Sequence, residues 1–344
     1  MTRGNGRVKV AVDAMGGDYA PGEIVKGAVL ASRRNNIEIA LVGSKHILEK
    51  ELDKYRSSNS SRIHLVEASE VITEDEPPAL AIRRKPDSSI AVATKLLKAG
   101  EVEALVSAGS SGAVAISAVQ HLGMLQGVER PSIGGYLGSF APNVIMVDIG
   151  ANTDCKPYQF VVFAIIGSVL AKKFLHIDNP TVALLSTGKE EGKGNELVRN
   201  SYSLLKNSNL NFIGNIEGGD ILKGAANVIV CDGFVGNVLL KFYESLGDYA
   251  LGWTKQKVSK YPLLGNIAGL LFNKLFPVTK MTREIEDKGS GILWGVNGIV
   301  RLAHGACQAP AMERAIANAK HAVNVGVISC LEAELANFNN ELKV

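Results

Sequence analysis

The chain has 344 residues, of which 46% are hydrophobic, so it is long enough to bury one large α/β core or two smaller ones. Its 37 basic and 34 acidic residues leave a net charge of +3, a balance that argues against a surface built to bind nucleic acid. Four separated cysteines without a CxxC pair suggest neither a zinc site nor a disulfide framework, and with no signal-peptide stretch before residue 8 we expect a soluble cytoplasmic protein.

Short apolar runs alternate with longer stretches of helical periodicity, which is typical of βαβ units around a mainly parallel sheet. The expected strands are residues 8–12, 37–42, 63–66, 104–106, 144–147, 182–185, 211–213 and 228–230. The expected helices are residues 23–32, 45–55, 88–99, 113–122, 158–175 and 195–206. Residues 123–143 are predicted as an irregular or short-hairpin insertion, and after Asp232 we expect only helix. The fold class predicted is α/β, as a single domain over residues 1–344.

Five strand ends share one pattern, in which small or acidic residues and glycine precede a helix-like stretch. They are VAVDAMGGD, LVSAGSSGA, VDIGAN, LLSTGKEEGKGN and VCDGFVGN. Ligands of doubly wound sheets bind beyond the carboxyl ends of the strands, where glycine permits close backbone approach and free N–H groups can hold an oxyanion. A single loop of this kind is better explained as a turn with a helix cap, but the five together favour a shared phosphate site.

The standard nucleotide and hydrolase motifs are incomplete. GKEEGK at residues 188–193 is one residue too short between its glycines for a P-loop, and Gly194 stands where Ser or Thr would bind magnesium. No GxGxxG follows the first strand, and GSSG at residues 109–112 is not the GxSxG of an α/β-hydrolase. The sequence therefore contains no complete P-loop, dinucleotide-binding or hydrolase motif.

Charged and amide side chains at the strand ends supply the remaining candidates. The carboxylates Asp13, Asp18, Asp148 and Asp232 could hold a divalent metal or could cap helices; we expect no metal, since magnesium usually takes only one or two carboxylates plus substrate phosphates. Lysine can neutralise phosphate, and asparagine can polarise a carbonyl without changing protonation. These residues are Lys189, Lys193, Asn152, Asn195, Asn215 and Asn237.

Taken in order, the segments DAMGGDYAPGEIVKGA, SAGSSGA, VDIGAN, EEGKGNE, FIGNIEGGDIL and CDGFVGNVLLK resemble the PlsX phosphate acyltransferases of bacterial phospholipid synthesis over most of the chain. The resemblance implies a Rossmann-like three-layer α/β/α sandwich, related to phosphotransacetylases and isopropylmalate dehydrogenases. It implies a homodimer that needs no cofactor and transfers a fatty acyl group from acyl carrier protein to inorganic phosphate. The acyl phosphate product would pass to a glycerol-3-phosphate acyltransferase.

Two loops depart from the family pattern. Ser110 and Ser111 stand where the family usually reads SAGNTGA, and residues 186–190 read STGKE where it usually reads NIGEE. Lys189 reverses a charge, so it is not assigned the family's role. Two alternatives therefore stay open: a phosphotransacetylase-like enzyme that uses acyl-coenzyme A, and a non-catalytic phosphate-binding module.

The chemistry implied by the resemblance needs no covalent intermediate. A thiol with a pKa near about 8.5 is a good leaving group and phosphate is already anionic, so the enzyme has to align them and stabilise the oxyanion. We expect Lys193 to hold phosphate or the oxyanion and Asn237 to orient the reacting carbonyl. The other expected substrate-binding residues are Asp13, Gly16, Gly17, Asp18, Ser107, Gly109, Ser110, Ser111, Gly112, Asp148, Gly150, Asn152, Asn195, Asn215, Glu217, Asp232 and Gly233.

A second surface is predicted at residues 253–281, as a protruding amphipathic helical segment with lysines and aromatic residues at its edges. It could lie in a membrane interface or contact the acyl chain, and ordinary dimer core is the alternative. Its apolar residues are Leu263, Leu264, Ile267, Leu270, Leu271, Phe272 and Leu275. We expect peripheral membrane association from it. The basic residues 83–85 could contact an acidic carrier protein or form a solvated helix end.

Overall fold

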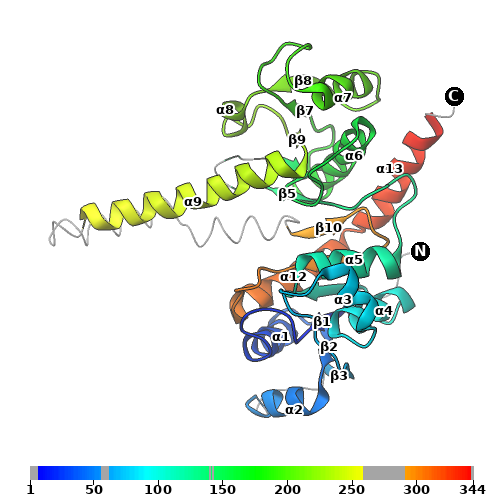
Figure 1. Ribbon diagram of the computed structural model, residues 1–344, viewed down its shortest axis with the longest axis vertical. Coiled ribbons are helices and arrows are strands. Elements are labelled where there is room, and N and C mark those ends of the chain that lie inside the picture. The colour runs from blue at the N-terminus through cyan, green and yellow to red at the C-terminus, as the bar shows by residue number, and fades with distance from the viewer. Residues whose placement is uncertain (1–6, 56–61, 139–140, 142, 259–290, 342–344) are drawn as a thin grey trace. The chain divides into compact units, whose positions relative to one another are not determined.

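The computed structural model describes residues 7–55, 62–138, 141, 143–258 and 291–341. The chain divides into two compact units, residues 1–131 with 289–344 and residues 132–288 (Figure 1). Each unit is an α/β arrangement with a mostly parallel sheet, as the sequence predicts. A single domain over the whole chain stays a prediction, and the two units are described one by one.

The first unit contains both ends of the chain. Its strands lie in the order β3-β2-β1-β4-β11-β10, parallel except for the antiparallel pair β10 and β11. The strands are β1 (Lys9–Asp13), β2 (Glu38–Gly43), β3 (Ile63–Glu67), β4 (Ala104–Ser107), β10 (Ile292–Trp294) and β11 (Ile299–Leu302). The helices are α1 (Gly22–Arg34), α2 (Lys45–Asp53), α3 (Pro78–Arg84), α4 (Ser89–Ala99), α5 (Ser111–Leu122), α12 (Ala309–Asn324) and α13 (Val327–Glu341). Every residue of β1 after Lys9 is buried, as expected of a central strand covered on both faces.

The second unit has five strands in the order β5-β6-β9-β7-β8, of which only β5 runs antiparallel to its neighbour. They are β5 (Ser132–Tyr136), β6 (Ile145–Val147), β7 (Val182–Leu185), β8 (Phe212–Ile216) and β9 (Val228–Val230). The helices are α6 (Pro157–Phe174), α7 (Glu196–Lys206), α8 (Gly218–Ile221) and α9 (Gly233–Val258).

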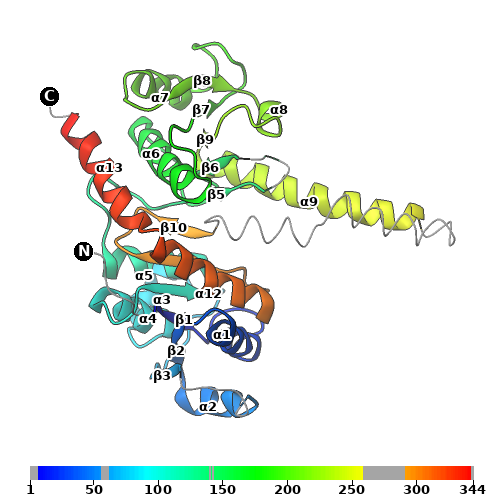
Figure 2. The ribbon, with the colours of Figure 1, turned by 180° about the vertical axis from the view of Figure 1, so that it is seen from behind.

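The helix α6 is apolar and long enough to cross a membrane by length and composition, but 78% of it is buried inside the structure. Gly167 lets α6 approach β9 closely, because a Cβ there would lie 2.4 Å from a side-chain carbon of Val228. This contact makes α6 the core helix of its unit. The helix α9 of the same unit extends well beyond the sheet of that unit in both views (Figures 1 and 2).

All eight strands expected from the sequence are present, but the expectation of only helix after Asp232 is wrong. The segment ILWGVNGIVRL forms β10 and β11, and β11 pairs parallel with β4 in the first unit. These strands have only three and four residues, too few for a visible alternation, and their pairing partners lie far away in the chain. The short helices α3 and α8 were not predicted either.

The predicted amphipathic segment falls mostly outside the described residues. Its first six positions, 253–258, form the end of α9. The residues proposed to contact a membrane or an acyl chain lie beyond it, outside the described part of the chain: Leu263, Leu264, Ile267, Leu270, Leu271, Phe272 and Leu275.

Candidate functional site

In the first unit, Asp13 joins two of the predicted loops. It ends β1 and is fully buried, and its carboxylate accepts hydrogen bonds from Ser107 Oγ at 2.6 Å and from the Met15 N–H at 3.1 Å. Ser107 ends the neighbouring strand β4, and its Oγ accepts from the Gly109 N–H at 3.0 Å. Burial raises the pKa of Asp13 above its usual value, and the hydrogen bonds from serines and backbone oppose that rise. Asp13 therefore links the loop after β1 to the loop after β4.

The glycines of these loops allow the backbones to touch. A Cβ on Gly16 would lie 2.6 Å from both Asp13 Oδ2 and the Gly109 nitrogen, so no other residue fits there without a shift. Gly17 has a φ of 105°, a conformation that favours glycine. The exposed Asp18 is anchored through its backbone, whose N–H donates to the Gly305 carbonyl at 2.9 Å.

The loop after β4 opens directly into α5. Ser110 is buried just before the helix, while Ser111 and Gly112 are exposed in its first turn. The N–H groups of a first helical turn have no partner within the helix and carry partial positive charge. This end of α5 is therefore suited to an anion, as the sequence predicts for SAGSSGA.

In the second unit, Asp148 organises the loop after β6. It is fully buried, and its Oδ1 accepts the N–H groups of Ile133, Gly150 and Ala151, each at 3.1 Å. Its Oδ2 accepts both the backbone N–H and the Nδ2–H of Asn152, each at 2.8 Å. Burial raises the pKa of Asp148, against the effect of these bonds. With both oxygens engaged, Asp148 shapes the loop rather than offering a free carboxylate.

The first turn of α9 packs directly onto this loop. A Cβ on Gly233 would lie 2.8 Å from the Asn152 nitrogen and oxygen, and one on Gly236 would overlap the Asp148 carbonyl oxygen. Asp232 begins the helix, since its Oδ1 accepts the N–H of the residue three positions on at 2.8 Å. The pattern DGFVGN is thus a helix cap followed by two contact glycines.

This packing places Asn237 beside the loop. The side chain is half-buried, and its amide group lies 3.7 Å from where a Cβ on Gly150 would stand. The Gly150 backbone has a φ of 150° and no side chain to cover the amide. Asn237 is therefore positioned to reach a group bound over Gly150.

Lys193 lies in the loop after β7. It is exposed, and its carbon chain runs over Gly188, where a Cβ would come within 2.9 Å of it. Asn195 caps α7 by accepting the Val198 N–H at 2.9 Å. Lys193 thus lies three residues before the start of a capped helix, and its contact with substrate stays a prediction.

Two buried polar atoms lie beneath the same loop. Asn215 Nδ2 donates to the Glu190 carbonyl at 2.9 Å, which ties the loop to β8. Asn215 Oδ1 and Ser186 Oγ have no hydrogen-bond partner among the described residues. Buried polar atoms are normally satisfied, so these two are available to a bound ligand or to water. Sequence reasoning missed Ser186 because a serine after a strand is an ordinary turn residue.

Lys189 has a structural partner. Its Nζ lies 3.0 Å from Asp220 Oδ2, and Lys223 Nζ lies 3.2 Å from the other oxygen of the same carboxylate. The hydrogen bonds from Lys189 and then Lys223 lower the pKa of Asp220 to about 2. The Glu217 N–H also donates to this carboxylate at 3.4 Å. Lys189 therefore fastens its loop to α8, which agrees with leaving it out of the predicted chemistry.

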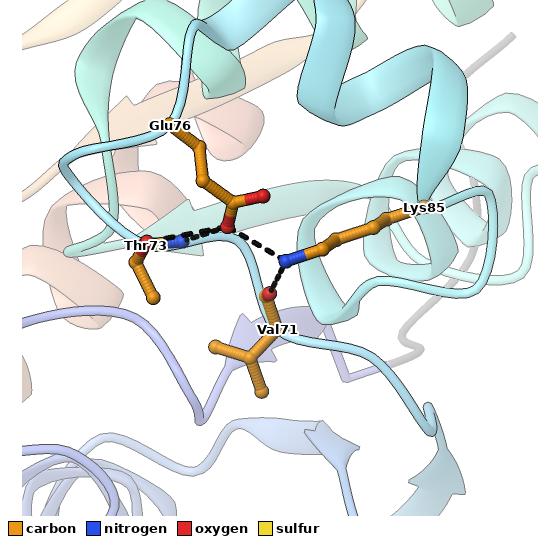
Figure 3. Close-up of polar contacts among 4 residues, drawn as sticks. All are labelled: Val71, Thr73, Glu76 and Lys85. Carbon is orange, nitrogen blue, oxygen red and sulfur yellow. Dashed lines mark hydrogen bonds and ion pairs between the residues drawn. The ribbon is translucent and has the colours of Figure 1, made fainter.

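The basic residues at the end of α3 are divided in their roles. Lys85 Nζ donates to the Val71 carbonyl and to Glu76 Oε1, each at 2.7 Å, and Thr73 donates to the same Glu76 oxygen (Figure 3). The hydrogen bond from Lys85 is the main cause that holds the pKa of Glu76 below its usual value. Lys85 is thus part of the loop, whereas residues 83 and 84 are exposed.

The predicted site residues therefore form two sets. One set, around Asp13 and the start of α5, belongs to the first unit, and the other, around Asp148 and the start of α9, belongs to the second. No group of three or more His, Cys, Asp or Glu that could hold a metal occurs in the part of the chain that the structure describes. The individual substrate contacts stay predictions.

Two solved structures have a similar fold. A phosphotransacetylase from Streptococcus pyogenes matches 92% of this chain and 94% of its own with a TM-score of 0.62 at 16% identity. A branched-chain phosphotransacylase from Enterococcus faecalis matches 92% of this chain and 99% of its own with a TM-score of 0.56 at 12% identity. The fold is thus that of the phosphotransacetylase class.

Sequence comparison defines the family. The family model described as "Fatty acid synthesis protein" matches residues 8–330. A phosphate acyltransferase from Thermoanaerobacterium thermosaccharolyticum is 43% identical over 335 residues, covering 97% of this chain and 99% of the relative. One from Dictyoglomus turgidum is 45% identical over 323 residues, covering 93% and 95%. The chain belongs to the fatty acid synthesis protein family.

Proposed function

We propose that this protein transfers a fatty acyl group from acyl carrier protein to inorganic phosphate and releases an acyl phosphate. The observation that carries the proposal is full-length similarity to relatives named phosphate acyltransferase, at 43% and 45% identity. The loops quoted above for the resemblance contain the folded features that hold the backbone in place. These are the Asp13–Ser107 and Asp148–Asn152 hydrogen bonds and the glycines at 16, 233 and 236.

The reaction transfers the acyl group from the thiol of the carrier protein to an oxygen of phosphate. A phosphate oxygen attacks the thioester carbonyl carbon, the carbonyl electrons move to oxygen, and their return breaks the C–S bond. The thiolate leaves and takes a proton from solvent. The barrier falls when phosphate is aligned with the carbonyl and the oxyanion is stabilised by fixed donors.

Two side chains of the second unit suit these tasks. Lys193 carries an exposed ammonium group at the entrance of α7 and would neutralise phosphate or the developing oxyanion. Asn237 has its amide beside the open backbone at Gly150 and would orient the carbonyl without taking up a proton. The predicted phosphate cradle of the first unit, at the DAMGGD and SAGSSGA loops, stays a separate proposal.

Acyl carrier protein is proposed as the donor in place of coenzyme A. Carrier proteins of this kind are acidic, and Arg83 and Arg84 present two exposed positive charges at the end of α3. Complementary charge raises the rate of encounter and fixes orientation. We propose these arginines as one part of the carrier-binding surface.

A homodimer is proposed from α9. The side chains of Phe234, Val238, Phe242, Leu246 and Tyr249 recur every three or four residues and are each more than half exposed. This spacing puts them along one face of the helix, and a large exposed apolar stripe marks an interaction surface. A second copy of α9 would cover the stripe symmetrically. We also propose a cytoplasmic protein that touches the membrane through residues 253–281 and hands its product to a glycerol-3-phosphate acyltransferase.

One experiment tests the proposal against its alternatives. The purified protein is incubated with inorganic phosphate and either palmitoyl-acyl carrier protein or palmitoyl-coenzyme A, and acyl phosphate is trapped with hydroxylamine. We expect hydroxamate from the carrier-protein thioester at a rate well above that from coenzyme A. A preference for coenzyme A would support the phosphotransacetylase-like alternative. The absence of product from both donors would support the alternative of a non-catalytic phosphate-binding module.

A further inference from the structure

The second unit contains an apolar cavity, two of whose lining residues, Phe242 and Leu246, also belong to the exposed stripe of α9. Its volume is about 160 Å³, and almost its whole surface is carbon. It is lined by residues of β6, α8, α9 and the segment after β5: Leu137, Ala141, Met146, Gly218, Ile221, Leu222, Leu239, Leu240, Phe242, Tyr243 and Leu246. The cavity opens to the surface, because Leu222, Phe242 and Leu246 in its lining are more than half exposed. An apolar pocket of this kind favours an apolar ligand over a charged one.

Three walls of the cavity are continuous with the predicted substrate loops. Met146 lies in β6, and Asp148 follows the end of that strand by one residue. On α9, Leu240 follows Asn237 by three residues, a spacing that places both on one side of the helix. On α8, Gly218 directly follows Glu217. The cavity therefore begins where three of the predicted site loops end.

The size of the cavity suits part of a hydrocarbon chain. An engineered cavity of about 150 Å³ holds a benzene molecule, so about 160 Å³ has room for roughly six carbon atoms. Along α9 the distance from Asn237 to Leu246 is about 13 Å at 1.5 Å per residue. A linear chain could thus run from the amide of Asn237 along the helix.

The tyrosine in the wall remains uncharged at the pH of a cell. Burial, followed by the nearby Tyr136, raises the pKa of Tyr243 to about 12. The ring therefore presents a neutral surface to the cavity.

We propose that this cavity binds the part of the acyl chain next to the reacting carbonyl, and so sets a preference for long linear acyl groups over acetyl. The proposal rests on the proposed function for the identity of the substrate. It places the acyl chain in the cavity of the second unit and not against the predicted segment at residues 263–275. Each methylene transferred from water to an apolar site changes affinity about fourfold, so a chain that fills the cavity gains strongly over acetyl.

Two adjacent glycines allow a matched test. A Cβ would meet nothing within 4 Å at either Gly218 or Gly219, but only Gly218 lines the cavity. The Gly218→Leu variant therefore adds an apolar side chain to the cavity wall, and Gly219→Leu adds the same side chain at the next position, outside the lining. Acyl phosphate formation is measured for each with palmitoyl and acetyl thioesters of the same carrier protein.

We expect Gly218→Leu to lower kcat/KM for the palmitoyl thioester at least tenfold and to change that for acetyl less than twofold. Gly219→Leu should change neither by more than twofold. Equal losses with both thioesters in Gly218→Leu, or no loss with either, would overturn the proposal. A change of oligomeric state in Gly218→Leu by light scattering, without a shift in chain preference, would also overturn it and assign the cavity to contact with a second copy.

A second measurement does not depend on turnover. Dodecanoic acid carrying a terminal diazirine is photolysed with the wild-type protein, and the labelled peptides are identified by mass spectrometry. Labels in residues 218–222 or 239–246 that are lost in Gly218→Leu support the cavity even if no acyl phosphate forms from any donor, in which case the proposed function alone fails. Labels confined to other segments overturn the cavity proposal.

Discussion

Asn152 donates its backbone N–H and its side-chain Nδ2–H to the same oxygen of Asp148, each at 2.8 Å. The other oxygen of Asp148 accepts three further backbone N–H groups. A single buried carboxylate thus fixes the loop on which the first turn of α9 rests, and with it the position of Asn237. The candidate site of the second unit depends on this carboxylate for its geometry.

The Asp148→Asn substitution tests this dependence. The new amide can accept at one oxygen only, and its NH₂ group would face the donors of Asn152 in a buried site. Unsatisfied buried donors cost about 1–3 kcal/mol each, against some relief from removing a buried charge. We expect the free energy of unfolding in urea to fall by about 2 kcal/mol. Asp178→Asn, at an exposed position, is the control and should change it by less than about 0.5 kcal/mol.

Gly236→Ala should be harmful although alanine favours helices. The new Cβ would overlap the Asp148 carbonyl oxygen, and overpacking of this kind costs about 3 kcal/mol. Gly219→Ala adds the same methyl group in open space and should be neutral within about 0.5 kcal/mol. Urea unfolding of both variants measures the difference, and equal stabilities would show that α9 does not pack on the loop as described.

Asn237→Ala should lower kcat for acyl phosphate formation by about 10²- to 10³-fold, the usual effect of removing one donor to a developing oxyanion. The stability should change little, because the side chain is only half-buried. Lys241→Ala lies one turn further along α9 at an exposed position and serves as the control. A near-normal kcat in Asn237→Ala would remove this residue from the mechanism.

Lys193→Ala should act mainly on phosphate. Its exposed ammonium is proposed to neutralise the nucleophile, so the variant should show a KM for phosphate raised at least tenfold, measured at saturating acyl donor. Lys189→Ala, which loses the ion pair with Asp220, should affect this KM much less. The reverse order would exchange the roles given to the two lysines.

Asp13 should give stability a specific pH dependence. Its folded pKa is raised by burial, so the folded state holds this proton more tightly than the unfolded state. The contribution is fully present below the unfolded value of 3.8 and is lost as the pH rises through the folded pKa. Urea unfolding at several pH values should therefore show Asp13→Asn gaining on the wild type as the pH rises from about 4. Parallel profiles would contradict the raised pKa.

The sequence predicts the parallel strands of both units well, because β1, β4, β7 and β9 are short apolar runs that end in glycine-rich loops. It fails for β10 and β11, whose partners are far away in the chain, and for α3 and α8, which are only seven and four residues long. For the site, the sequence names candidate residues, whose substrate contacts stay predictions, and it does not reveal their structural roles. Whether a carboxylate such as Asp148 faces a ligand or its own loop depends on backbone donors that no motif reveals.

The glycine pattern illustrates the same limit. DGFVGN indicates a strand-to-helix turn, yet only the folded backbone shows that residues 233 and 236 are contact points against one loop. The cavity of the second unit is likewise invisible in the sequence, since its lining comes from separate segments that look like ordinary core.

The most direct test of the account is the fate of labelled phosphate. The protein is incubated with palmitoyl-acyl carrier protein and phosphate carrying four ¹⁸O atoms, and the products are analysed by mass spectrometry. Direct attack by phosphate predicts palmitoyl phosphate that keeps all four labelled oxygens, together with one free carrier thiol per product. Release of the carrier thiol with only free palmitate, or no release at all, would contradict the account.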